Sequence, residues 1–260
     1  MSSGGVMREG NSTSDRTLAI LEMFSHEQPA LSARELAAGL GVARSTAYRY
    51  LQTLVSAGYL NESPDGGFQL GSKVVELAQV ARGRNNLVDL AGPEMLAVAE
   101  RFGQTVLLTK LVAGAILCVE QVDAPAQFVR LSYRRGGQMA MNAGASALVC
   151  VAWLSDIELD FLLQERPLQR ISDDTITDPA AFRARLARIR SDGYVVTRGE
   201  VDVEGMGIAV PIFASDGRVV AGLSVVGLQT RISAEAVPQI IDMLQQSARV
   251  VSGGLALYGT

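Results

Sequence analysis

Residues 32–52 read SARELAAGLGVARSTAYRYLQ and hold the signals for two consecutive helices and the turn between them. Ser32 and Glu35 match a capping box, in which the serine hydroxyl accepts from the Glu35 amide while the glutamate reaches back to the cap amide. The GLG triplet at 39–41 permits a tight turn, and helical periodicity restarts over 43–57. This stretch therefore predicts a helix-turn-helix.

The second of these helices has two unlike faces. One face is apolar and carries Ala47, Tyr50, Leu51 and Leu54. The opposite face carries Arg44, Ser45, Tyr48, Arg49 and Gln52. No acidic residue occurs from 41 to 60, whereas a face that only meets solvent normally mixes both signs of charge. We therefore predict that the polar face binds DNA, with a merely solvated face as the alternative reading.

The flanking sequence completes a winged helix. Upstream, Leu18, Leu21 and Phe24 recur three apart and predict a first amphipathic helix that ends at the Gln28-Pro29 pair. Downstream, the turn SPDGG at 63–67 separates two short apolar segments and predicts a β-hairpin, the wing.

Composition excludes several classes of protein. With 260 residues, 48% hydrophobic and net charge -4, the chain predicts a globular protein of about two domains. Cys118 and Cys150 cannot form a disulfide framework or a zinc site, and His26 is the only histidine, which disfavours most nucleophilic catalysis. The start of the chain has no apolar signal segment and no stretch is long enough to span a bilayer, so we expect a cytoplasmic protein without metal or membrane contact.

The remainder of the chain alternates between strand and helix patterns. Helices are expected over 73–84, 87–102, 143–154, 156–164 and 178–191 and from 233 onward. Strands are expected over 105–111, 115–121, 194–197, 207–213 and 219–226. We therefore predict a second, mixed α/β domain with an antiparallel sheet.

Several ordered motifs show which family the chain resembles. They are LSAREL and Ala37 at 31–37, RSTAYR at 44–49, GYL at 58–60, TITD at 175–178, IAVPI at 208–212 and LSV at 223–225. In these motifs the chain resembles the IclR family of bacterial transcriptional regulators from about Ser14 to its C-terminus.

The resemblance implies an α+β protein with a winged helix-turn-helix joined by a linker helix to an effector-binding α/β domain similar to GAF domains. The implied division is a disordered tail at 1–12, a DNA-binding domain at 13–72, a linker helix at 73–86 and an effector-binding domain at 87–258. Such a protein is a transcriptional regulator, expected to be a repressor. It binds a palindromic double-stranded DNA operator as a homodimer or homotetramer and needs no cofactor.

The residues expected to contact DNA lie on the two helices of the motif. They are Ser32, Arg34, Arg44, Ser45, Thr46, Tyr48, Arg49 and Gln52. Each arginine can donate two hydrogen bonds to a guanine or can bind phosphates. The other residues supply hydroxyl and amide groups that can hydrogen-bond to DNA. For Ser32, helix capping and a phosphate contact are both open. For Thr46, packing is the alternative to a phosphate contact.

The resemblance also places an effector pocket. The corresponding positions are Ala145, Ser146, Thr197, Gly207, Ser224 and Val226. Polar residues frequent in the family are replaced at Thr197, Gly207 and Val226, among others, which leaves the pocket fewer polar partners. Because unpaired buried polar groups are costly, we expect a larger, aromatic or hydrophobic acid rather than a compact keto acid. Purely structural roles remain open for Ser146, at a helix start, and Ser224, within its sheet.

Two other kinds of protein stay open at this stage. One is an enzyme with a DNA-binding appendage, which would have to use residues such as Glu120, Glu200 or Lys110 because the second domain has no histidine. The other is a regulator whose second domain only oligomerises. The arginines at 130, 134 and 135 have two readings: they pair with the carboxylate of an effector, or they lie in a solvated surface loop. The sequence does not identify the effector, the operator or the regulated genes. It also leaves open repression or activation, and a dimer or a tetramer.

Overall fold

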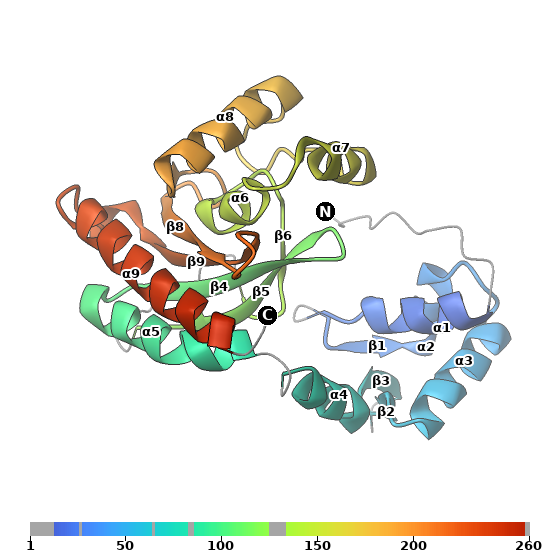
Figure 1. The fold of residues 1–260 in the computed structure, drawn as a ribbon. Helices are drawn as coiled ribbons and strands as arrows, with labels where there is room; N and C mark the ends of the chain where they lie inside the picture. Colours follow the sequence, from blue (N-terminus) through green and yellow to red (C-terminus); the bar gives the residue numbers. More distant parts are fainter. Residues whose placement is uncertain (1–12, 26–27, 64–65, 83–85, 125–133, 258–260) are drawn as a thin grey trace. The chain divides into compact units, whose positions relative to one another are not determined.

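The computed structural model describes residues 13–25, 28–63, 66–82, 86–124 and 134–257. The chain divides into two compact units, residues 1–84 and 85–260 (Figure 1). The predicted tail at 1–12, His26 and Arg130 lie outside the described residues.

The first unit has the predicted helix-turn-helix and wing. Its elements are α1 (Thr13–Glu22), β1 (Ala30–Ser32), α2 (Ala33–Gly39), α3 (Arg44–Ser56), β2 (Leu60–Glu62), β3 (Gly67–Leu70) and α4 (Ser72–Arg82). The wing strands β2 and β3 pair antiparallel, and Leu36, Leu51 and Leu60 are fully buried in the core between helices and sheet. The predicted apolar face of α3 is confirmed, because Ala47, Tyr50, Leu51 and Leu54 are all buried.

The first helix differs from its prediction in length and in the side it buries. It ends at Glu22, not at Gln28-Pro29, and Leu18 is 60% exposed while Ile20 is fully buried. The chain leaves the helix early because residues 30–32 form a strand, β1, which the sequence did not predict. β1 pairs with β3, so Leu31 lies opposite Phe68 in the core.

The helix expected over 73–86 also has other bounds. α4 ends at Arg82, and the next helix, α5 (Asn86–Phe102), already belongs to the second unit. Apolar side chains of α4 are largely uncovered in this chain: Val75, Leu77 and Val80 are 59%, 44% and 67% exposed.

The second unit is built on one antiparallel sheet, as predicted. The strands are β4 (Thr105–Val112), β5 (Ala115–Val122), β6 (Gln138–Met139), β7 (Val195–Arg198), β8 (Gly205–Phe213) and β9 (Val219–Leu228). They lie in the order β6-β5-β4-β9-β8-β7, and each neighbouring pair is antiparallel. The short strand β6 was not predicted, because two residues carry no alternation.

Helices cover both faces of this sheet (Figure 1). They are α5, α6 (Ala145–Val151), α7 (Asp156–Glu165), α8 (Pro179–Asp192), the short 3-10 helix Gln229–Arg231 and α9 (Ala236–Leu257). α5 and α9 pack on one face and α6 and α8 on the other, so alternate strand residues enter different cores. Val225 lies in the first core and Val226 in the second.

Two predicted helix features of this unit are confirmed. All seven residues of α6 are buried, as expected of a core helix. Asp178 caps α8 by accepting from the Ala181 amide at 2.8 Å, and Pro179 follows as the first helical residue. Among the described residues, no helix has the length and apolar character needed to cross a membrane.

The packing of α6 on the sheet depends on a glycine in β9. A Cβ on Gly222 would lie 2.3 Å from Val149 Cγ1 and 2.8 Å from Thr109 Oγ1. We therefore expect Gly222→Ala to lower the free energy of unfolding by about 1–3 kcal/mol, because α6 must move away from the sheet. Gly253→Ala is the matched control: its Cβ would meet nothing within 4 Å, so alanine should stabilise helix α9 by up to about 1 kcal/mol.

Urea denaturation measures both variants. Trp153 is the only tryptophan and lies in the second unit, so its fluorescence reports on that unit alone. Equal midpoints for Gly222→Ala and the unsubstituted protein would contradict close packing of α6 against β9.

Candidate functional sites

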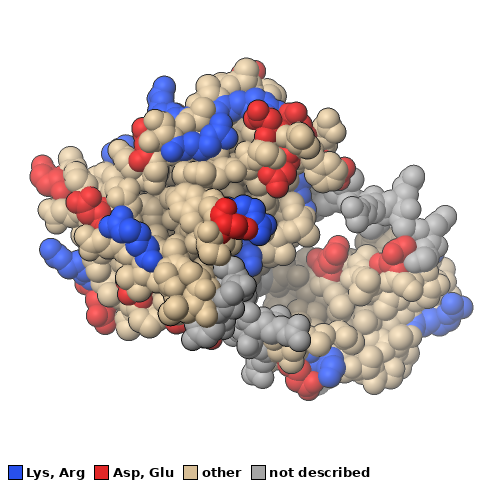
Figure 2. All heavy atoms as spheres, in the orientation of Figure 1, with Lys and Arg blue, Asp and Glu red and all other residues tan. Residues whose placement is uncertain are grey.

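The first candidate site is the exposed face of α3. Arg44, Ser45, Tyr48, Arg49 and Gln52 are all exposed there, as the sequence predicted. Figure 2 shows basic side chains at the edge of the first unit that α3 forms. These groups can therefore reach a partner without any unfolding of the helix.

Tyr48 links this face to the wing. Its ring meets the ring of Phe68 edge to face, with centroids 6.4 Å apart, and Phe68 is a core residue of β3. The guanidinium carbon of Arg44 lies 5.9 Å from the centroid of the Tyr48 ring, within range of a cation–π contact. The stack orients Arg44 and Tyr48 on the rigid core of the unit.

An acidic residue also reaches this face, which the sequence pattern did not indicate. Glu62 lies on β2, outside the stretch that lacks acidic residues, and its Oε1 accepts a hydrogen bond of 3.2 Å from Gln52 Nε2. The pairing of β2 with β3 brings Glu62 to the end of α3. Gln52 therefore has a protein partner that a base or phosphate contact would have to replace.

Ser32 and Arg34 lie at the start of α2. The Ser32 hydroxyl donates to Glu35 Oε2 at 2.6 Å and accepts from the Glu35 amide at 3.3 Å, so the predicted capping box is present. These hydrogen bonds from Ser32 lower the pKa of Glu35 below its ordinary value. Arg34 follows in the first turn of α2, and its side chain is exposed. The capping role of Ser32 is thus observed.

The start of α3 is built differently. Its N-cap residue is Ala43, which has no side-chain oxygen, so no side chain satisfies the first amides of this helix. Thr46 follows in the first turn and is half-buried. A helix N-terminus of this kind can accept a phosphate.

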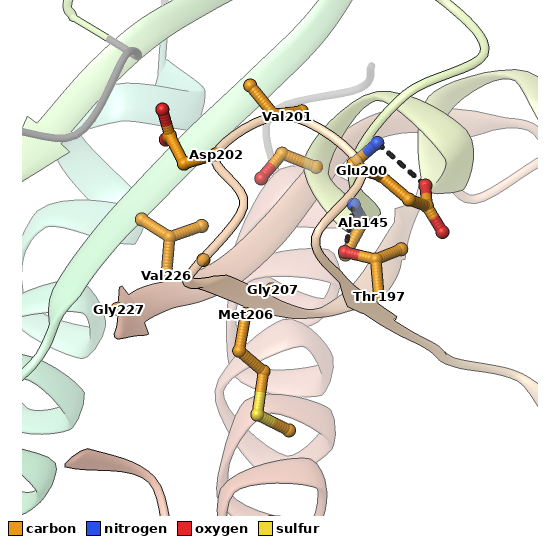
Figure 3. Close-up of a pocket in the computed structure, with 12 residues that line it drawn as sticks. Ala145, Thr197, Glu200, Val201, Asp202, Met206, Gly207, Val226 and Gly227 are labelled. Carbon is orange, nitrogen blue, oxygen red and sulfur yellow. Dashed lines mark hydrogen bonds between the residues drawn. The ribbon is translucent and has the colours of Figure 1, made fainter. Parts of the chain in front are cut away.

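The second candidate site is a pocket in the second unit, where β8 and β9 meet the start of α6 (Figure 3). Its lining residues are Gly144, Ala145, Ser146, Thr197, Glu200, Val201, Asp202, Gly205, Met206, Gly207, Val226 and Gly227. Five of the six predicted effector positions are among them. The cavity volume is about 30 Å³, which holds only one or two water molecules.

The sixth predicted position, Ser224, lies below the pocket instead of in its wall. It is fully buried, and its Oγ lies 2.7 Å from Ser146 Oγ in a hydrogen bond between α6 and β9. Ser224 is therefore absent from the lining of the pocket, and its role in effector binding stays a prediction. The reason is that its hydroxyl is used to join the helix to the sheet, and Thr109 does the same by donating to the Ser146 carbonyl at 2.7 Å.

Polar groups meet at the base of the pocket (Figure 3). The Ala145 amide donates to Thr197 Oγ1 at 3.1 Å, and the Gly144 amide donates to Glu200 Oε2 at 3.1 Å. Gly207 makes this approach possible, because a Cβ there would lie 3.1 Å from both Ala145 Cβ and Thr197 Oγ1. Close packing against Ala145 and Thr197 therefore also favours glycine at position 207.

Glu200 was not predicted as a pocket residue. It is 7% exposed, its second oxygen accepts from Arg185 Nη2 of α8, and its backbone carbonyl accepts from Thr175 Oγ1 at 3.1 Å. It therefore anchors the segment 199–205, which supplies Val201, Asp202 and Gly205 to the pocket wall. No local sequence signal identifies it, because its partners lie on three distant segments.

Several of the remaining reactive side chains in the described part of the chain are paired or buried. Glu120 is paired with Arg135 at 2.8 Å and Glu200 with Arg185, which engages two of the three residues that an enzyme reading would use. Burial raises the pKa of Cys118 to about 12 and that of Cys150 to about 11, so neither is a thiolate at neutral pH. No group of metal-binding side chains occurs in the described part of the chain.

Known protein families match both units. A model described as the IclR helix-turn-helix domain matches residues 13–64, and one described as the C-terminal domain of the bacterial transcriptional regulator IclR matches residues 79–253. The chain belongs to the IclR family of bacterial transcriptional regulators. Its motif-based resemblance to this family is confirmed.

Members of the IclR family are similar to almost the whole chain. The HTH-type transcriptional regulator KipR of Bacillus subtilis is 26% identical over 246 residues, which cover 95% of this chain and 98% of KipR. BhcR of Paracoccus denitrificans is 30% identical over 243 residues, covering 93% and 86%. A crystal structure of an IclR homolog complexed with 4-hydroxybenzoate, from Microbacterium hydrocarbonoxydans, has a TM-score of 0.82 and 30% identity, covering 93% of this chain and 98% of that one.

Proposed function

We propose that this IclR-family regulator is a cytoplasmic repressor that binds a palindromic operator and is controlled by an organic acid. The observation that carries the proposal is that one chain holds both an exposed, donor-rich recognition helix and a separate pocket with polar groups at its base. Repression is supported by one relative, YiaJ of Escherichia coli, which is 24% identical over 249 residues and is named a DNA-binding transcriptional repressor. The proposed domains are 13–72 for DNA, 73–86 as linker and 87–258 for the effector.

The DNA contacts are assigned to the first unit. Arg44, Ser45, Tyr48 and Arg49 are proposed to read or clamp the duplex, and Arg34, Thr46 and Gln52 to assist at the rim. Because the Ser32 hydroxyl donates to Glu35 Oε2, its proposed phosphate contact requires the hydroxyl to turn from that carboxylate and donate to a phosphate oxygen.

A dimer or dimer of dimers fits both the binding mode and the surface. One winged helix reads few base pairs, whereas a symmetric dimer reads two half-sites about 34 Å apart. The exposed apolar side chains Val75, Leu77 and Val80 of α4 are consistent with a partner subunit on this helix.

The proposed effector is an aromatic or hydrophobic carboxylic acid. Ala145, Val201 and Val226 give the pocket apolar walls. The polar groups at its base are few, and the amides at the start of α6 donate to Glu200 and Thr197, so an acid would have to replace these acceptors. The complex of a relative with 4-hydroxybenzoate supports this class of ligand. Since the closed cavity is too small for such an acid, we propose that binding moves the segment 199–205 and so favours one arrangement of the dimer.

The other two readings have less support. The relatives are transcriptional regulators, and the carboxylates that an enzyme would need are engaged in ion pairs, so we propose that the protein is not an enzyme. A regulator whose second unit only oligomerises would not need a pocket with converging polar groups.

Thermal unfolding and DNA binding, measured on the full chain with the same compounds, test the proposal. We expect 4-hydroxybenzoate at 100 times its Kd to raise Tm by about 5–10 °C and to change the affinity for DNA flanking the protein's own gene. Pyruvate, a compact keto acid, should do neither. Stabilisation by pyruvate alone would refute the aromatic assignment, and no response to any acid would favour the ligand-independent reading.

A further inference from the structure

The pocket holds a carboxylate of its own at its base. Glu200 lines the cavity, is almost fully buried, and accepts a hydrogen bond of 3.1 Å at Oε2 from the Gly144 amide. Figure 3 shows its carboxylate turned toward the start of α6, where a dashed line marks this bond. The other oxygen, Oε1, accepts from Arg185 Nη2 of α8. One carboxylate therefore bridges an amide of the pocket and an arginine that is not among the lining residues.

An acid that enters the pocket brings the same chemical group. Its carboxylate is acceptor-only and negatively charged, like that of Glu200. The closed cavity of about 30 Å³ has no room for it beside Glu200, and two carboxylates at one donor repel each other. An acid that binds to the Gly144 amide must therefore replace Glu200 there.

Glu200 can give up this amide without losing its charge partner. Arg185 donates to the other oxygen, and its side chain is only 19% exposed, so the ion pair stays in place when Oε2 is released. The backbone carbonyl of Glu200 also keeps its hydrogen bond from Thr175 Oγ1. The exchange therefore replaces one charged acceptor on Gly144 by another.

The exchange also releases the wall of the pocket. The segment 199–205 is closed at its neck, because the Gly199 amide donates to the Gly205 carbonyl at 2.9 Å. Glu200 joins this segment to the start of α6 through Gly144. Once an acid has taken that amide, the segment loses this link and can part from α6, which enlarges the cavity.

We propose that Glu200 is an internal competitor of the effector, and that its carboxylate occupies the position which the carboxylate of the effector takes in the bound state. The inference rests on the proposed function, because it needs the effector to be an acid bound in this pocket. The competitor lowers the measured affinity by the fraction of molecules in which the amide is free. It also disfavours neutral ligands, since a neutral group makes a weaker hydrogen bond to Gly144 than Glu200 does.

Chemical rescue of Glu200→Ala tests whether this position takes a carboxylate from solution. The variant leaves Gly144 and Arg185 without their acceptor and leaves space for a short acid. Relative to the same concentration of sodium chloride, sodium acetate at about ten times its Kd should raise Tm, followed by Trp153 fluorescence, by about 3–6 °C. Acetamide, which has a similar shape but no charge, should not raise it.

Asp160→Ala is the control for the rescue, because it removes the carboxylate of a surface ion pair with Arg183 of the same helix. Its Tm should be equal in acetate and in chloride. An equal Tm of Glu200→Ala in the two salts would contradict a carboxylate position at Gly144 and Arg185.

Glu200→Gln tests the exchange without leaving a cavity. Its side chain keeps the size of glutamate but is a weaker acceptor, so 4-hydroxybenzoate should bind about fivefold more tightly in calorimetric titration of the full chain. Adding Arg185→Gln restores the net charge of the unsubstituted protein and removes any attraction by the freed arginine. This double variant should still bind the acid more tightly than the unsubstituted protein does.

The outcomes separate the competitor from the proposed effector. Affinity at or below that of the unsubstituted protein in both glutamine variants would overturn the competitor role of Glu200. If none of these proteins binds 4-hydroxybenzoate while acetate still stabilises Glu200→Ala, the aromatic effector is wrong and the carboxylate position is supported.

Discussion

Replacing Arg44 and Arg49 together with alanine is expected to weaken sequence-specific binding of operator DNA by about 30-fold to 10⁴-fold. Each bidentate arginine contact to a base contributes about 1–3 kcal/mol of discrimination, and the two arginines lie on the same exposed face of α3. The double variant should fold normally, because alanine favours helix and neither side chain is buried.

Fluorescence anisotropy over a range of salt concentrations measures this loss and identifies its kind. If the arginines clamp phosphates, affinity for every sequence falls and the slope of log affinity against log salt decreases by about 1.8 per subunit. If they contact bases, the slope changes little and the preference for the operator over other DNA falls.

The matched control removes two positive charges from the second unit. Arg218→Ala combined with Arg249→Ala leaves the net charge equal to that of the α3 variant, and both residues are exposed. This control should retain operator binding within a few-fold. Tight, sequence-selective binding by the Arg44, Arg49 variant would contradict the assignment of α3 as the recognition helix.

Glu200→Ala is expected to lower the free energy of unfolding of the second unit by about 2–4 kcal/mol. The substitution leaves Arg185, whose side chain is only 19% exposed, without its carboxylate, and breaking such a buried pair is strongly destabilising. It also leaves the Gly144 amide without its acceptor at the base of the pocket. Glu200→Gln keeps an acceptor for that amide, so it should lower the free energy of unfolding by less than Glu200→Ala does.

Helix α8 supplies the comparison for this variant. Figure 2 shows basic side chains along the part of the second unit that α8 forms, and two of its arginines make ion pairs of different burial. Arg183 pairs with Asp160 at the surface, with side chains 36% and 57% exposed, so Asp160→Ala should cost less than about 1 kcal/mol. Urea denaturation followed by Trp153 fluorescence compares the two; equal losses would contradict a special role for the Glu200 pair.

Loss of the Glu200 anchor should also change the pocket. Glu200 holds the segment 199–205 to Gly144, Arg185 and the Thr175 hydroxyl. Effector affinity should be measured under conditions in which both variants are folded. We then expect Glu200→Gln to alter that affinity and Asp160→Ala to leave it unchanged.

For the first unit, the sequence predicted most of what the structure shows. The capping box of α2, the buried face of α3 and the wing hairpin depend on hydrogen bonds and periodicities within a few residues, so local sequence determines them. The third strand β1 and the early end of α1 were missed, because Leu31 becomes a strand residue only by pairing with Phe68, which is distant in sequence.

For the pocket, family motifs located five of the six predicted residues in one wall, and the fold then revealed what the motifs did not. Ser224 turned out to bond to Ser146 beneath the pocket, whereas Glu200 joins its base. Both results depend on which strands are neighbours, which local patterns do not contain.

By itself, then, the amino-acid sequence determined the local elements, the antiparallel α+β class and the donor-rich face of α3. These follow from periodicity and capping, whose interactions span a few residues. Only the tertiary structure decided that Glu62 reaches Gln52, that Arg185 neutralises Glu200, and that Thr105 of β4 pairs with Val226 of β9. Those contacts join residues on separate elements, and strand order and register, which bring them together, are set by packing of the whole unit.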